Sequence, residues 1–105
     1  MTERGYSLQE IADYSGLKLG VVRGASQRHR FNPLDRRFRA YHYSREEARQ
    51  IALAGLLANR GIFRGEVDAA VRMLRANPKA STIELTIGLG MVLSISVKEA
   101  IGDMP

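Results

Sequence analysis

The sequence predicts a mainly α-helical protein with a small β component, consisting of four helices and a C-terminal β-hairpin. Before residue 77, apolar side chains recur at helical spacing in four stretches separated by glycine or proline. From Ile83 to Val97 the apolar residues instead recur at every second position, as in a β-strand. With 105 residues, 45% of them hydrophobic, the chain has room for one compact core. We therefore expect a main unit at 1–76 and a hairpin extension at 77–105.

The first two helices are predicted to be joined by a short turn. Ser7 and Glu10 form a capping-box pattern, which predicts a first helix from about Leu8 to Tyr14. Gly16 permits the turn, and a second helix is predicted from residue 18 or 19 to Arg28.

The predicted second helix carries an unusual outward stripe. Its inward positions are Leu19, Val22 and Ala25 or Ser26, and its outward positions are Gly20, Arg23, Gly24 and Gln27. Each internal glycine costs a helix about 1 kcal/mol relative to alanine, so the alternative is a loop or a frayed helix. Missing side chains also let a helix approach another surface closely. Beside these glycines lie Arg23, Gln27 and Arg28, residue types that bind the DNA backbone or hydrogen-bond to base edges.

The stretch from Phe31 to Tyr43 alternates aromatic and basic residues after the Asn32-Pro33 break, which predicts a short β-ribbon with outward arginines.

Two helices follow the ribbon. Ser44 opens a third helix at about 45–59, which Gly61 ends, with a core of Ala48, Ile51, Ala52, Leu56 and Leu57 or Ala58. The fourth runs from about Gly65 to Ala76 before Asn77-Pro78, with Val67, Ala70, Val71 and Leu74 facing inward. A helix-turn-helix followed by a ribbon is a winged helix-turn-helix.

The terminal hairpin is predicted to turn through a three-residue loop at 88–90. This loop puts Ile87 opposite Met91, Leu85 opposite Leu93 and Ile83 opposite Ile95, whereas a two-residue loop would mismatch the faces. A hairpin alone is marginal in water, so its apolar face must be covered. We favour coverage by the third and fourth helices, and the alternative is pairing with a second chain.

Positive charge is concentrated in the middle of the chain. Of a formal net charge of +5, the segment from Lys18 to Arg45 holds +7 and the remainder −2. Nearly all the cations of this segment are arginine, whose planar fork suits phosphate oxygens and guanine edges. The pattern favours a polyanion site over an ordinary solvated charged face.

Other classes of function find little support. The chain has no cysteine, no secretory signal pattern and no apolar run near the roughly 20 residues of a membrane helix. His29 and His42 lack metal-ligand spacing, and the Glu46-Glu47 pair suits a helix start better than acid–base chemistry. We expect no enzyme activity, cofactor or metal, and a cytoplasmic, nucleoid-associated location.

The order of these motifs resembles the MerR-type winged helix-turn-helix over residues 6–75. The similar pieces are Tyr6 to Leu17, Val22-Arg23, Tyr43 to Glu47 and Gly61 to Val67. The resemblance implies that the second helix enters the major groove, that Arg23 contacts DNA and that the wing touches the backbone.

The chain also departs from that family. Gly24 and Ala25 stand where the family usually has tyrosines, and Tyr41 stands where the wing usually has arginine. Pro78 and the hairpin replace the family's coiled-coil helix and effector domain. These differences predict an atypical binding surface and target sequence.

The leading hypothesis is a sequence-preferring DNA-binding transcription regulator that acts on double-stranded DNA as a homodimer. The expected DNA-binding residues are Lys18, Arg23, Gln27, Arg28, Arg30, Arg36, Arg37, Arg39, Tyr41 and Arg45. The alternatives are an excisionase-like architectural DNA-binding factor and a protein-interaction module acting through the hairpin.

Overall fold

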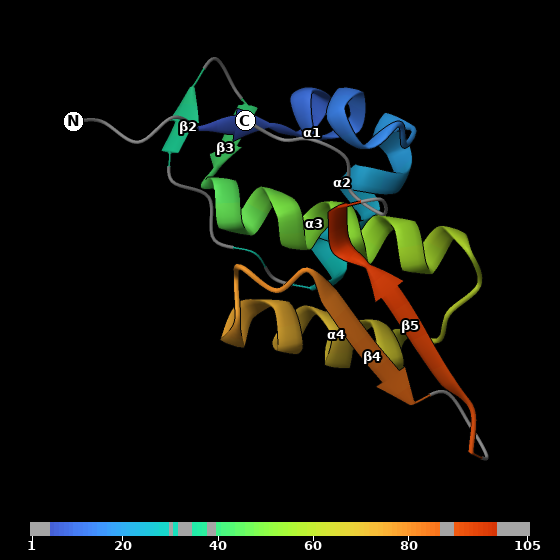
Figure 1. Cartoon of the computed structure of the whole chain (residues 1–105). Helices are drawn as coiled ribbons and strands as arrows, with labels where there is room; N and C mark the ends of the chain where they lie inside the picture. Colours follow the sequence, from blue (N-terminus) through green and yellow to red (C-terminus); the bar gives the residue numbers. More distant parts are fainter. Residues whose placement is uncertain (1–4, 30, 32–34, 38–39, 87–89, 99–105) are drawn as a thin grey trace.

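A computed structural model describes residues 5–29, 31, 35–37, 40–86 and 90–98, without the side chains of 35–37, 40 and 41. Its elements are β1 (Tyr6–Ser7), α1 (Leu8–Ser15), α2 (Leu19–Arg28), β2 (Asp35–Arg37), β3 (Ala40–Tyr43), α3 (Arg45–Asn59), α4 (Arg64–Ala76), β4 (Thr82–Thr86) and β5 (Val92–Ser96). The predicted class is confirmed, with four helices, a β2–β3 ribbon after the α1–α2 pair, and a C-terminal hairpin (Figure 1).

The start of α1 follows the predicted capping box. The amide of Glu10 donates to Ser7 Oγ and the amide of Ser7 donates to Glu10 Oε1, each at 3.2 Å. Gly16 ends the helix with a φ of 74°, and its amide donates to the carbonyl of Ala12 at 2.9 Å. This φ is strained for any residue with a Cβ, so the turn into α2 requires glycine at this position.

The ribbon belongs to a three-stranded antiparallel sheet of order β1-β3-β2. The sequence did not predict β1, which pairs Tyr6 with Tyr43 and Ser7 with His42. Because β1 has only two residues, its sequence cannot show the alternation of apolar and polar residues that identifies a strand. Tyr6 and Tyr43 are both buried and join the sheet to the core.

Helix α3 runs through the middle of the molecule, packed against α2 on one side and α4 on the other (Figure 1). The predicted core residues Ala48, Ile51, Ala52 and Leu57 are buried. Leu56 was expected in the core but is only half-buried. The sequence missed Gln50, Leu53, Ala54 and Gly55, which are buried because α3 is covered on two sides.

The turn from α3 into α4 satisfies the last carbonyls of α3. Gly61 has a φ of 81°, and its amide donates to Ala58 while that of Ile62 donates to Leu57, each at 3.1 Å. This is the bonding pattern of a Schellman motif. Helix α4 then begins at Arg64, one residue before the predicted start. All four of its predicted core residues are buried: Val67, Ala70, Val71 and Leu74.

The hairpin has the predicted register, with Ile83 opposite Ile95 and Leu85 opposite Leu93. Gly90 has a φ of 74°, while Ile87 and the rest of the loop lie outside the described residues. The buried hairpin side chains join the same hydrophobic cluster as α3 and α4, and β4 packs on α4. The apolar face of the hairpin is therefore covered mainly within its own chain, as favoured, with Leu93 half-buried beside the C-terminal end of α3. No helix in the described part of the chain has the length and hydropathy needed to cross a membrane.

Candidate nucleic-acid interface

Helix α2 is two-sided largely as its sequence predicts, except that Leu19, expected inward, and Gly24, expected outward, are both half-buried. Val22, Ala25 and Ser26 are buried, while Gly20, Arg23 and Gln27 are exposed. The hydroxyl of Ser26 donates to the carbonyl of Arg23 at 2.8 Å, so this inward polar group is satisfied within the helix. The outward face of α2 thus presents one cation and one amide a helical turn apart.

The cations of α2 meet no opposing charge on their own helix, which contains no acidic residue. Lys18, at the N-cap, and Arg23 are exposed, and neither has an ion-pair partner among the residues that the structure describes. Arg28 is also exposed, and its guanidinium lies back over Gly24, with Nη2 3.1 Å from where a Cβ would stand. Lys18, Arg23, Gln27 and Arg28 are therefore the predicted site residues that the structure shows exposed on α2 and at its N-cap.

The packing of α2 against α3 depends on Gly55, which the sequence analysis did not identify. A Cβ at Gly55 would lie 3.1 Å from Leu17 Cδ1 and 3.5 Å from Val21 Cγ1. The missing side chain of Gly55 lets the turn and the first part of α2 approach α3 closely. The sequence gives no local signal for this because the contact joins segments more than 30 positions apart.

The C-terminal end of α2 is held by α4. Arg64 Nη2 donates to the carbonyl of Arg28 at 2.9 Å, and the imidazole of His29 pairs with the carboxylate of Asp68. The side chain of His29 is 4% exposed and that of Asp68 is 42% exposed. Arg64 is exposed, so it adds a second cation beside Arg28 at the C-terminal end of α2. Sequence reasoning missed all three side chains of this connection.

Residues 35–37, 40 and 41 of the wing are described only as backbone. Arg36 stands opposite Tyr41, and Arg37 opposite Ala40, on the β2–β3 ribbon. Their side chains, and Arg30 and Arg39 altogether, lie outside the described residues, so the proposed phosphate contacts of the wing stay predictions. Arg45 is exposed at the start of α3, beside the exposed Glu46.

Two further arginines are engaged in the fold. Arg49 Nη1 donates to the carbonyl of Pro78 at 2.6 Å, and burial together with the nearby Arg45 lowers the pKa of Arg49. The guanidinium of Arg75 lies 5.5 Å from the ring centroid of Phe31, and its Nε donates to Gln50 Oε1 at 3.1 Å. These contacts hold α3, α4 and the loops together, which distinguishes these arginines from those of α2.

The described residues contain no group of three or more side chains arranged to hold a metal ion. Comparison with protein-family models, with curated proteins and with solved structures found no match for this chain.

Proposed function

We propose that this chain is a sequence-preferring regulator that binds double-stranded DNA with α2 in the major groove. The observation that carries the proposal is the exposed pair Arg23 and Gln27 on a helix without acidic residues, flanked by Lys18 and Arg28. A surface that served only solubility would be expected to mix the two signs of charge.

The geometry of α2 suits this role. The major groove is about 12 Å wide and admits an α-helix. Arginine can bind guanine or a phosphate, and glutamine can bind adenine through two hydrogen bonds. Gly20 has nothing within 4 Å of the position of a Cβ, so the backbone of α2 is accessible to an approaching surface there.

The anchoring of α2 supports the same reading. Its inner face packs on α3 beside Gly55, and its last residues are tied to α4 through Arg64 and Asp68. A reading helix that is fixed before binding loses less conformational entropy on binding. On this proposal, the β2–β3 ribbon contributes phosphate contacts through Arg36 and Arg37, and two copies occupy a divided site.

The test begins with selection of duplexes from a random pool by the purified full chain. The enriched duplex and a shuffled duplex of the same composition are then compared by fluorescence anisotropy. We expect the enriched duplex to bind at least about a thousandfold more tightly, the lower limit of the range for specific binders. Equal affinity for both would contradict sequence-preferring recognition.

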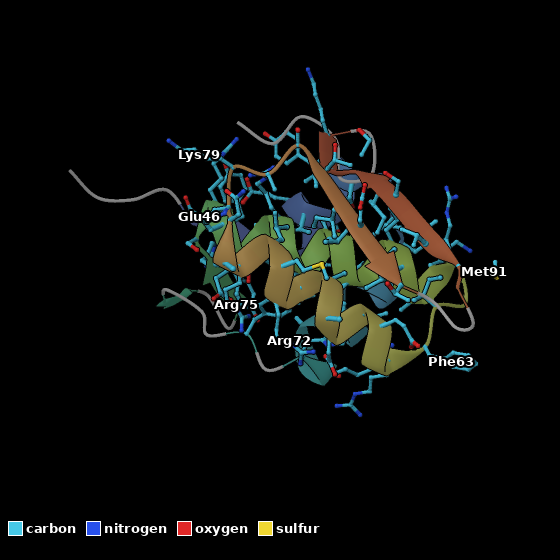
Figure 2. The ribbon with its side chains drawn as sticks, turned by 60° about the horizontal axis from the view of Figure 1, so that its bottom comes forward. Glu46, Phe63, Arg72, Arg75, Lys79 and Met91 are labelled. Carbon is cyan, nitrogen blue, oxygen red and sulfur yellow. The ribbon has the colours of Figure 1, made fainter. Side chains whose placement is uncertain are left out.

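A matched pair of variants locates the interface. Arg23→Gln should weaken binding by at least about tenfold, the effect of losing roughly 1.4 kcal/mol. Lys79→Gln removes the same charge from an exposed residue just before the hairpin (Figure 2), and should change binding less than about twofold. Equal effects of the two substitutions would show that only net charge matters.

A further inference from the structure

Strand β5 has an outer edge to which no other strand pairs in the described part of the chain. The amide of Val97 donates to the carbonyl of Ser81 at 2.9 Å. Hydrogen-bonded pairs alternate along an antiparallel ladder, so Ile95 and Leu93 also bond inward to β4. The backbone amides and carbonyls of Val92, Ser94 and Ser96 consequently point away from β4.

This edge lacks the features that usually prevent strand pairing. Natural edge strands commonly carry charges or proline that discourage a second strand. The residues of β5, Val92 to Ser96, include neither, whereas β4 carries Glu84. Val92 is 62% exposed, and Ser94 and Ser96 are also exposed. The edge of β5 is therefore an open template for another strand.

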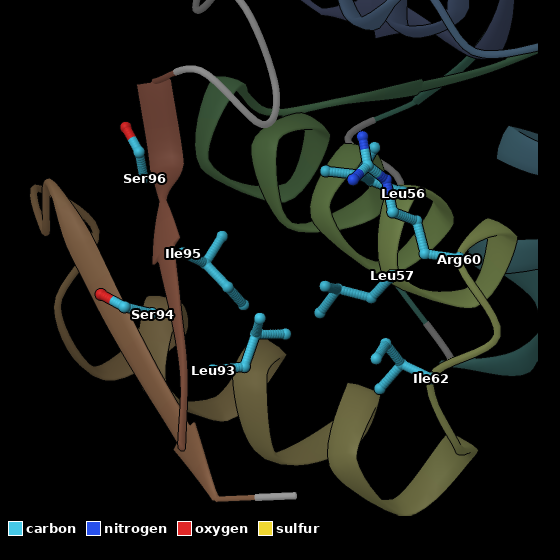
Figure 3. A pocket seen from close by; sticks show the side chains of 8 residues that line it. All are labelled: Leu56, Leu57, Arg60, Ile62, Leu93, Ser94, Ile95 and Ser96. Atoms are coloured by element: carbon cyan, nitrogen blue, oxygen red, sulfur yellow. The ribbon is translucent and has the colours of Figure 1, made fainter. Parts of the chain in front are cut away.

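A largely apolar groove of about 410 Å³ lies between β5 and the C-terminal end of α3. Figure 3 shows Leu57, Ile62, Leu93 and Ile95 pointing into it, while Ser94 and Ser96 point away. Phe63 and Met91 are 79% and 62% exposed and lie toward the same end of the molecule (Figure 2). A strand added along β5 would cover part of this apolar surface.

We infer that a second copy of this chain pairs with β5 through its own β5, antiparallel, about a twofold axis at Ser94. The outward backbone groups of Val92, Ser94 and Ser96 are symmetric about Ser94, so the reversed strand is complementary to itself. Ser94 then faces Ser94 of the other copy, and Val92 faces Ser96.

Charge favours a second copy at this face. The chain carries a net +5, of which Lys18 to Arg45 holds +7 and the rest −2. Two copies therefore repel less where they meet outside that segment. The five residues of β5 carry no charge, and Arg60 is the charged residue that lines the adjoining groove. If the proposed function is right, this interface joins the two copies that bind DNA. The interface itself is tested without DNA.

The test is the mass of the full chain in solution, measured by sedimentation velocity without DNA. The wild type should have twice the 11.7 kDa mass of the chain. Ser94→Lys should be monomeric because two lysines would face each other across the axis. Ser94→Glu combined with Glu84→Gln, which avoids like charges within the hairpin, should also be monomeric. Mixing these two variants should restore a dimer containing one of each.

Glu84→Gln alone is the matched control on the neighbouring strand and should remain dimeric. Circular dichroism and thermal unfolding of each variant show whether the fold is kept, and Ser94→Pro supplies a second probe because the Ser94 amide does not bond to β4. A monomeric wild type, a dimeric Ser94→Lys variant or a mixture that stays monomeric would overturn the inference. A dimer without DNA affinity would instead refute the proposed function and leave this interface standing.

Discussion

The guanidinium of Arg64 donates a hydrogen bond to the backbone carbonyl of Arg28 at 2.9 Å, which places a cation of α4 at the C-terminal end of α2. The carbonyl end of a helix carries a partial negative charge, so a cation there is favourable. With the neighbouring pair of His29 and Asp68, this bond makes the position of α2 depend on α4.

Arg64→Met should lower the free energy of unfolding by about 0.5–1 kcal/mol, because a charged hydrogen bond to a helix end is lost at an exposed site. Urea denaturation measures the change. Arg72→Met, on the same helix, is the control: Arg72 is exposed and has no partner among the described residues, so we expect less than about 0.5 kcal/mol. Equal losses for both variants would remove the assigned role of Arg64.

The pair of His29 and Asp68 should show energetic coupling. In a double-mutant cycle with His29→Gln and Asp68→Asn, we expect an interaction energy of about 1 kcal/mol, because the imidazole is almost fully buried. Gln9 and Asp13 provide the comparison, since Gln9 Nε2 donates to Asp13 Oδ1 at 3.0 Å on the exposed face of α1. That cycle should give about 0.2–0.5 kcal/mol. Additive effects at His29 and Asp68 would contradict the predicted coupling.

Gly20→Ala should separate stability from DNA binding. The position is open, so alanine should raise the free energy of unfolding by about 0.4–1 kcal/mol. The added methyl group stands on the proposed reading face, and we expect affinity for DNA to fall about fivefold or more. Gly65→Ala is the matched control, because Gly65 is also the second residue of its helix and equally open. It should stabilise similarly with unchanged affinity; a similar loss of affinity would argue against the assigned face.

Gly55→Val should destabilise the protein by about 1–3 kcal/mol, because a Cβ already meets Leu17 at 3.1 Å and the branched side chain must displace α2. Gly65→Val, at an open position, measures the effect of valine in an exposed helix and should cost clearly less. Urea denaturation gives both values. A Gly55→Val variant as stable as wild type would mean that α2 and α3 are not packed as closely as described.

Local patterns predicted most of the secondary structure. The capping residues Ser7 and Ser44 and the turn glycines Gly16 and Gly61 act within a few positions, so the sequence shows them directly. The hairpin register was also predictable, because strand alternation and loop length allow few pairings.

The interactions that the sequence did not reveal join distant segments. His29 and Asp68 are 39 positions apart, and Gly55 meets Leu17 only after α2 folds onto α3. The periodicity of α3 was a poor guide to Gln50 and Leu53, since a helix covered on two sides has no single inward stripe. The cationic face of α2 was predicted, but its anchoring by Arg64 was not.

On the proposed function, α2 binds DNA through cations that neutralise phosphates and read bases. The sharpest test of this binding is the slope of log Kobs against log salt concentration for wild type and Arg23→Gln on one duplex. We expect a steep negative slope for wild type. Arg23→Gln should make the slope shallower by about one if Arg23 neutralises a phosphate, or should abolish the preference for the selected sequence if Arg23 reads a base. A wild-type affinity that does not change with salt would refute the proposed function.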